Sequence, residues 1–299
     1  MPGGAPAPGI LLVDKPGGMT SHDVVARARR ALGTRKIGHA GTLDPLATGL
    51  LVLGVEGATR LLTFIVGLDK TYEATIRLGV STDSDDADGT VMQQTDASAT
   101  PSEAIHAAIE PLRGTISQVP SRVSAIKVDG KRAYALAREG IEVELAPREV
   151  VIGRFEVLAE RRHDGVVDLD VVVDCSSGTY IRSLARDLGA ALGVGGHLTA
   201  LRRTRVGPFG VEGAASLDDL AATPLLAPAA VAAAVLGRFE VTAEEARDLR
   251  HGKRLSGAAE RLEGVHSAAI DPAGVLVGIV ERRGADVKSA MNMPEEQSR

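Results

Sequence analysis

The sequence predicts an α+β fold, in which a mixed, mainly antiparallel sheet with flanking helices is followed by a small β-rich C-terminal domain. Two β-branched stretches meet at Asp164-Gly165, a hairpin signal that favours antiparallel pairing. Other short apolar strands are interspersed with stretches of helical periodicity. From Arg238 onward the order of strand, helix and two further strands starts afresh, which indicates a second domain.

The predicted organisation has four segments. The chain has 299 residues, which is long enough for one large domain and one small one. The Pro/Gly/Ala-rich beginning and the polar end lack periodicity and are expected to be disordered. The segments are residues 1–9 (disordered), 10–237 (large domain), 238–283 (small domain) and 284–299 (disordered tail).

Individual elements follow from periodicity and from capping residues. Strands are expected where short apolar or alternating runs are bounded by turn residues, at residues 10–13, 50–55, 70–79, 150–157, 166–173, 239–241, 265–270 and 274–281. Helices are expected where apolar residues recur every three or four positions after a suitable first residue, starting at Thr20 or Ser21, Ala58, Pro101, Thr179, Ala221 and Thr242.

Composition excludes several classes of protein. No apolar run reaches the roughly 18 residues of a membrane span, and the N-terminal residues do not resemble a signal peptide, so we expect a cytoplasmic protein with no membrane contact. One cysteine, Cys175, excludes an internal disulfide and a zinc-binding cysteine cluster. Aromatic residues make up 2% of the chain, which disfavours a stacking platform for single strands.

The net charge of the chain does not by itself exclude a nucleic-acid partner. The net charge of −5 argues against a nucleic-acid partner, but phosphate contacts are local, and basic residues cluster at 27–36 and 202–205. Residues 81–89 are acidic and bounded by glycine, and we predict a solvated loop there. The alternative, a metal-binding loop, lacks the glutamate that an EF-hand needs at its twelfth position.

The strongest candidate for a functional site is residues 38–49. Three glycines, a proline and two threonines exclude a long helix, and a buried strand is predicted directly afterwards. Asp44 therefore lies on a shaped loop close to His39, where a carboxylate is suited to chemistry. The pattern alone leaves an alternative open, because an aspartate before a proline opens turns more often than it catalyses.

The sequence of this loop, Gly-His-Ala-Gly-Thr-Leu-Asp-Pro-Leu-Ala-Thr-Gly, resembles motif II of the TruB family, the bacterial tRNA pseudouridine-55 synthases. Five further stretches resemble family segments, at residues 15–24, 70–73, 119–134, 178–182 and 197–209. In the third of them, Val119 replaces the first proline of the family's proline pair. Residues 238–283 resemble the family's PUA-type RNA-binding module more loosely. The resemblance implies a sheet core of the pseudouridine synthase type and a PUA-like second domain.

The resemblance also implies the site residues. Asp44 takes the place of the family's catalytic aspartate, and Tyr72 that of the tyrosine packing on the target base. Arg182 takes the place of the arginine that pairs with the aspartate, and it is expected to keep Asp44 ionised. The residues expected to contact or support the bound substrate are His39, Tyr180, Leu201, Lys15, Lys127 and Arg202.

Some of these roles have alternatives. His39 is expected to fill the space that the target base vacates, with a local hydrogen bond as the other reading. We expect Lys15 mainly to support the catalytic loop. Lys127 is expected at the RNA, although a lysine with a buried stem is equally plausible. Arginines 202, 203 and 205 are expected to bind phosphate.

The implied reaction breaks the C1′–N1 bond of a uridine, turns the base and joins C1′ to C5. It requires no cofactor and no metal, and the target base must leave the RNA stack. Asp44 attacks C1′ or assists elimination at C2′, and the sequence leaves both routes open. The implied partner is the T-arm stem-loop of tRNA, and the enzyme is expected to act as a monomer without a protein partner.

Two rival functions remain at this stage. One is an RNA-binding protein that keeps the fold without turnover, which the joint presence of Asp44, Tyr72 and Arg182 disfavours. The other is a hydrolase with Cys175 as nucleophile. No His/Asp signature accompanies this cysteine, and a lone cysteine at a strand end is usually inert packing.

Overall fold

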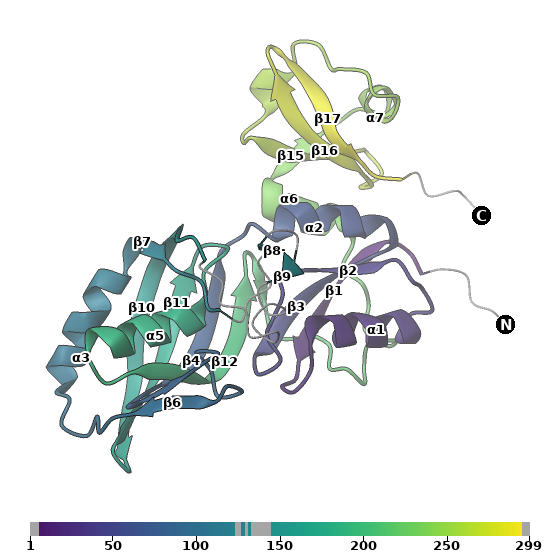
Figure 1. Ribbon diagram of the computed structural model, residues 1–299. Helices are drawn as coiled ribbons and strands as arrows, with labels where there is room; N and C mark the ends of the chain where they lie inside the picture. The colour runs from purple at the N-terminus through teal and green to yellow at the C-terminus, as the bar shows by residue number, and fades with distance from the viewer. Residues whose placement is uncertain (1–5, 123–126, 129–130, 133–144, 295–299) are drawn as a thin grey trace.

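The computed structural model describes residues 6–122, 127–128, 131–132 and 145–294. Within them, a nine-stranded sheet forms the large domain and a four-stranded sheet forms the C-terminal domain (Figure 1). Two small hairpins lie outside these sheets, β5 (Val80–Thr82) with β6 (Val91–Gln94) and β8 (Lys127–Val128) with β9 (Lys131–Arg132). The predicted α+β class, with a mostly antiparallel mixed sheet, is confirmed.

The large sheet is mainly antiparallel. Its order is β1 (Gly9–Lys15), β3 (Thr48–Val55), β12 (Gly196–Val206), β4 (Lys70–Leu78), β11 (Val166–Cys175), β10 (Arg148–His163) and β7 (Gly114–Gln118), with β2 (Ile37–Ala40) beside β3 and β13 (Phe209–Gly210) beside β12. The one parallel pair of this sheet joins β3 to β12, where Thr48 and Gly49 face Arg202 and Arg203. This junction connects the predicted catalytic loop to the centre of the sheet.

Helices cover the sheet at both ends. They are α1 (Ser21–Ala31), η1 (Glu56–Leu61), α2 (Leu62–Ile65), α3 (Ser102–Ile109), η2 (Glu110–Leu112), α5 (Ile181–Ala191) and α6 (Pro228–Leu236). Figure 1 shows α3 and α5 on one face of β10 and β11, where Phe155 and Leu184 are fully buried in a shared core. The helix expected from Ala58 is a 3₁₀ segment followed by a single α-helical turn.

Strand β3 is apolar throughout because both of its faces are buried. Leu51 and Leu53 pack into the core beneath α1, whereas Leu50 and Val52 face the opposite core, which includes residues of α6. A strand that is covered on both faces needs apolar residues at consecutive positions. Helix α1 is held at its start by a capping box, in which Thr20 accepts from the backbone of Asp23 and the Asp23 side chain accepts from the backbone of Thr20.

The C-terminal domain is larger than the sequence predicts. It contains β14 (Arg238–Glu240), α7 (Ala243–Arg250), η3 (Ala259–Arg261), β15 (His266–Ile270), β16 (Leu276–Arg283) and β17 (Asp286–Asn292). The disordered tail predicted from residue 284 is therefore wrong over β17. Gly284 turns the chain at φ 65°, and Val287 is fully buried in the domain core. A single buried valine in a polar stretch gives too weak a pattern to predict a strand.

The two domains share a hydrophobic cluster. It contains Ile10 and Leu50 from the large domain and Ile270 and Ile279 from the small one, with residues of α6 between them (Figure 1). The C-terminal sheet therefore packs on the large domain rather than extending from it on a linker. Among the described residues, no helix is long and apolar enough to span a membrane.

Gly49 offers a direct test of the β3–β12 junction. Its φ is +98°, and a Cβ at this position would lie 2.2 Å from the carbonyl oxygen of Arg203. We expect Gly49→Ala to lower the free energy of unfolding by about 2 kcal/mol or more, measured by urea denaturation. The control is Gly153→Ala in β10, where the nearest atom would lie 3.8 Å from the new Cβ. Equal stability of the two variants would contradict this account of the junction.

Candidate active site

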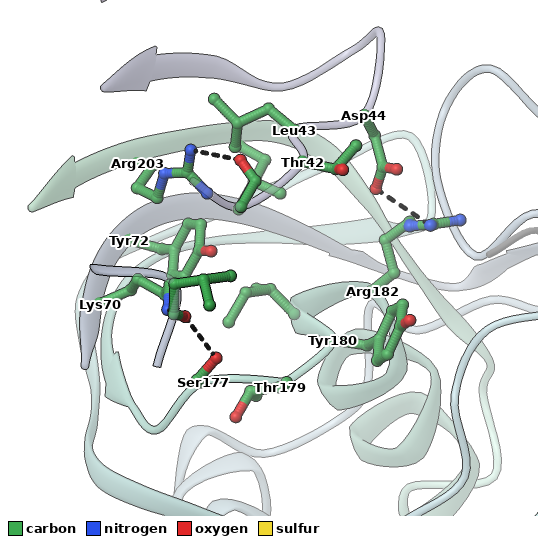
Figure 2. Close-up of a pocket in the computed structure, with 15 residues that line it drawn as sticks. Thr42, Leu43, Asp44, Lys70, Tyr72, Ser177, Thr179, Tyr180, Arg182 and Arg203 are labelled. Atoms are coloured by element: carbon green, nitrogen blue, oxygen red, sulfur yellow. Dashed lines mark hydrogen bonds and ion pairs between the residues drawn. The ribbon is translucent and has the colours of Figure 1, made fainter. Parts of the chain in front are cut away.

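A cavity of about 260 Å³ opens where the loop before β3 meets β4 and the start of α5 (Figure 2). Five of the predicted site residues line it: Asp44, Tyr72, Tyr180, Arg182 and Leu201. The other lining residues are Gly41, Thr42, Leu43, Val66, Lys70, Ser177, Gly178, Thr179, Ile181 and Arg203. Residues far apart in the sequence thus meet at one opening, as the family resemblance implies.

The loop that carries Asp44 is fixed on both sides. The hydroxyl of Ser21 accepts from the Leu43 amide at 2.9 Å and donates to the Leu43 carbonyl at 3.1 Å. On the other side of Asp44, the Pro45 carbonyl accepts from the Gly18 amide and from the Lys15 ammonium. Lys15 is fully buried and does not line the cavity, so its place fits the supporting role that we expected.

Arg182 joins Asp44 to a second carboxylate. Its Nη2 lies 3.0 Å from Oδ2 of Asp44, and its Nη1 lies 3.5 Å from Oδ2 of Asp86. Nη1 also donates to the Ser84 carbonyl at 2.9 Å and to the Ser121 hydroxyl at 3.1 Å. The pairing with Asp44 has the predicted geometry, and the additional partners fix the plane of the guanidinium group.

The acidic loop that supplies Asp86 is not the solvated loop that the sequence predicts. Ser84, Asp85 and Asp86 are only 5–8% exposed. Asp85 and Asp86 are each paired with an arginine of α5, at Arg186 and Arg182 respectively. A run of aspartates normally indicates a solvated surface, and its burial here depends on arginines about 100 residues later in the chain.

Burial and the neighbouring charges have opposing effects on the pKa of Asp44. Burial raises the pKa of its carboxyl above the ordinary value, and the negative charge of Asp86 raises it further, whereas Arg182 lowers it. One edge of the Asp44 side chain remains open to the cavity, because 40% of its surface is exposed. The expectation that Arg182 simply favours the ionised form is thus incomplete, since burial outweighs its effect and leaves the pKa raised.

Tyr72 and Leu201 form the less polar part of the cavity. Tyr72 lies in β4 at the centre of the sheet, and burial raises the pKa of its phenol, which therefore stays protonated at neutral pH. Leu201, on the neighbouring strand β12, is buried at the same opening. Figure 2 shows Tyr72 on one side of the cavity and the Asp44–Arg182 pair on the other.

Tyr180 is held by a residue that the sequence analysis missed. The Gln118 side chain accepts from the Tyr180 amide at 2.8 Å and donates to the Tyr180 carbonyl at 3.1 Å. The predicted helix cap at Thr179 is wrong, because α5 begins at Ile181 after Tyr180, and the Thr179 hydroxyl donates to the Ser176 carbonyl instead. The clamp depends on an amide side chain at the end of β7, which no local pattern indicates.

Among the described side chains, those of His39 and Arg202 do not line the cavity. His39 is half-buried in β2 with its ring edge against His22, and burial lowers its pKa, which favours the neutral imidazole. Arg202 forms a bidentate ion pair with Asp14, at 3.0 and 2.7 Å. Lys127 begins the short strand β8, and its side chain lies outside the described part of the chain.

Arg203 and Cys175 are both buried. Arg203 is 1% exposed and donates to backbone carbonyls, so it lies in the cavity wall rather than on the exposed surface. Cys175 is buried, and burial raises the pKa of its thiol to about 11. Because the thiolate is the nucleophile, this environment counts against the hydrolase alternative.

Comparison with known proteins identifies the family of this chain. Residues 29–181 match the model of the TruB family pseudouridylate synthase N-terminal domain. Residues 182–239 match a tRNA pseudouridylate synthase B C-terminal domain, and residues 236–294 match a tRNA pseudouridine synthase II C-terminal domain. The chain belongs to the TruB family. As a pseudouridylate synthase of this family it is an isomerase.

Similar proteins match nearly the full length of this TruB-family chain. It is 55% identical to a tRNA pseudouridine synthase B of Leifsonia xyli subsp. xyli, with 97% of each chain covered. It is 56% identical to a tRNA pseudouridine synthase B of Mycobacterium sp. (strain KMS), with 97% of this chain and 98% of the relative covered.

The fold is also shared with solved structures. A chain of an H/ACA RNP bound to a substrate RNA containing 2′-deoxyuridine gives a TM-score of 0.70 at 23% identity, covering 96% of this chain and 85% of the other. A chain of a Cbf5-Nop10-Gar1 complex gives a TM-score of 0.69 at 25% identity, with 96% and 84% covered. These similarities concern the fold.

The opposed charges around Asp44 predict a pH dependence. If Asp44 acts as the ionised carboxylate, turnover falls as the pH falls through its raised pKa, at a pH above that of an ordinary aspartate. Asp86→Asn removes a negative charge that raises this pKa. We therefore expect the acid limb of the pH–rate profile to move down by about one pH unit, with a lower plateau because Arg182 loses a partner.

The control for this profile is Asp88→Asn, which removes an exposed carboxylate from the same loop. Its acid limb is expected to coincide with that of the wild type. An unchanged limb in Asp86→Asn, or one displaced to higher pH, would show that Asp86 does not set the ionisation of Asp44.

Proposed function

We propose that this TruB-family enzyme converts the uridine at position 55 of tRNA, in the loop of the T-arm, to pseudouridine. The observation that carries the proposal is the Asp44–Arg182 pair at a cavity that also presents Tyr72 and Leu201. The names of the most similar relatives, tRNA pseudouridine synthase B, support tRNA as the substrate. We further propose that the enzyme acts in the cytoplasm as a monomer, without a protein partner.

The cavity supports a mechanism in which one nucleotide leaves the RNA stack. At about 260 Å³ it is close to the lower end of ligand pockets, which suits a single flipped nucleotide better than a folded loop. The Tyr72 ring and the Leu201 side chain offer apolar faces for the uracil. Asp44 then acts on the sugar from the opposite side of the cavity, with its orientation fixed by Arg182.

Two chemical routes are compatible with Asp44. In one, its carboxylate attacks C1′ and displaces the base; in the other, it takes the C2′ proton and the base is eliminated. Both require the ionised carboxylate, and both release the base as an anion that must turn before C5 joins C1′. Tyr72 keeps its proton at neutral pH, which suits a packing role or proton donation rather than that of a base.

The test of the substrate is position-specific. We expect the purified enzyme to release tritium from a tRNA transcript made with 5-tritiated uridine, with the new pseudouridine at position 55. A transcript with cytidine at position 55 is the control, and it should release none. Tritium release from that control, or pseudouridine at another position of the wild-type transcript, would overturn the assignment to position 55.

The role of Arg182 is tested by a change that keeps its charge. Arg182→Lys loses the planar group that reaches Asp44, Asp86 and the Ser84 carbonyl together, so we expect kcat to fall by at least about 10²-fold. The matched control is Arg186→Lys, one turn further along α5, which pairs with Asp85 instead. The control should stay within about threefold of the wild type. Equal kcat values for the two variants would rule out a special role for Arg182.

A further inference from the structure

Two cations are buried in the cavity wall beside Tyr72. Lys70 is 6% exposed and Arg203 is 1% exposed, and both line the cavity. Figure 2 shows them on the same side as Tyr72, away from the Asp44–Arg182 pair. Neither forms an ion pair with a carboxylate anywhere in the described part of the chain. The exposed carboxylate of the adjacent Asp69 raises the pKa of Lys70 without forming an ion pair with it, so no contacting carboxylate neutralises the buried positive charge.

Both side chains donate to backbone carbonyls, and the Arg203 guanidinium also forms a hydrogen bond with the Tyr72 phenol. The Lys70 ammonium donates to the carbonyls of Val66 and Leu68. The Arg203 guanidinium donates to the carbonyls of Leu50, at 2.7 Å, and Gly41, at 3.1 Å. These bonds orient the two cations but cancel none of their charge. Burial lowers the pKa of Lys70 to about 8, so it still carries most of its charge at neutral pH.

A buried, unpaired charge is costly, and proteins usually pair it or hold it for a ligand of opposite sign. Arg182 differs, because Asp44 and Asp86 already balance its charge. The electrostatic field on the Tyr72 side of the cavity is thus suited to an anion that the protein itself does not supply. Two sources of that anion exist in an RNA substrate, a backbone phosphate and the base once it has been released.

We propose that Lys70 and Arg203 stabilise the negative charge on the uracil ring between cleavage of the C1′–N1 bond and formation of the C1′–C5 bond. This inference rests on the proposed function. When C1′–N1 breaks, its electron pair stays with the ring, spread over N1, O2 and O4. The new bond forms when a pair from the ring at C5 joins C1′, as the C1′–Asp44 bond breaks in the first route or as the proton taken by Asp44 returns to C2′ in the second. C5 then loses its proton and N1 gains one. Both routes open to Asp44 pass through this anion.

The base is favoured over a phosphate by where the cations lie. Both flank Tyr72, whose ring is the proposed surface for the uracil, and both are at least nine-tenths buried. Preorganised donors in a water-excluded wall act most strongly on charge that appears during the reaction. Phosphate contacts, in contrast, normally come from side chains on the exposed surface that follows the RNA backbone.

The test compares two leaving groups. Fluorine at C5 withdraws electrons, so 5-fluorouracil leaves more readily than uracil and needs less stabilisation as an anion. Single-turnover loss of the original nucleoside is measured at the target position, in tRNA carrying uridine or 5-fluorouridine, by nuclease digestion and chromatography. We expect Lys70→Met to slow the reaction by about 10²-fold with uridine and by less than about tenfold with 5-fluorouridine.

Three companion variants separate this role from a structural one. Lys70→Arg keeps the charge and should recover most of the rate with uridine. Lys15→Met removes a cation that is equally buried but off the cavity lining, and it should slow both substrates by the same factor. Lys70→Gln, which retains a donor for the Val66 carbonyl, serves for the comparison if the methionine variant does not fold.

The rate losses of Lys70→Met with the two nucleosides decide between the base and a phosphate as the anion. A larger loss with uridine than with 5-fluorouridine supports the proposal. Equal losses for the two nucleosides overturn it, and if the affinity for tRNA falls as well, the cations bind a phosphate instead. Conversion of the uridine tRNA by the wild type tests the proposed function separately, so failure of the inference and failure of the function can be told apart.

Discussion

Arg182 is the residue on which the arrangement of the site depends. Its guanidinium group contacts Asp44 from the loop before β3 and Asp86 from the loop after β5, while it is itself carried by α5. Three segments that are distant in sequence are thereby held within ion-pair distance in a nearly buried position. Its single positive charge faces two carboxylates, so removing Arg182 would leave both of them without their counter-charge in a nearly buried position.

The cavity separates two electrostatic environments. On one side, the Asp44–Arg182–Asp86 group has a carboxylate whose pKa is raised by burial and opposed by an arginine. On the other, Lys70 and Arg203 place positive charge beside Tyr72, and no carboxylate of the described residues forms an ion pair with either of them. A reaction that begins with an anion on the sugar side and transfers negative charge to the base fits this division. The sheet sets the spacing, since Tyr72 and Arg203 face each other in neighbouring strands.

The site residues that lie in motifs could be predicted from the sequence, whereas the residues outside the motifs that support them could not. Asp44, Tyr72 and Arg182 were predicted because each lies in a stretch resembling the family, and β3 because both of its faces are apolar. Ser21 and Gln118 were missed because their partners are backbone groups 22 and 62 positions away. Asp86 was missed because an aspartate-rich run normally indicates a solvated loop, and the arginine that pairs with it lies far away in the sequence. These contacts exist only in the folded chain, so local patterns do not contain them.

We propose that the Asp44 carboxylate performs the chemistry while the rest of the cavity binds and orients the nucleotide. The most direct test is single-turnover tritium release by Asp44→Asn, with binding of the same tRNA measured in parallel. The substitution keeps the shape of the side chain and removes its charge. We expect tritium release to be abolished while the affinity for tRNA stays within a few-fold of the wild type. Release at the wild-type rate would contradict it and place the catalytic group elsewhere in the cavity.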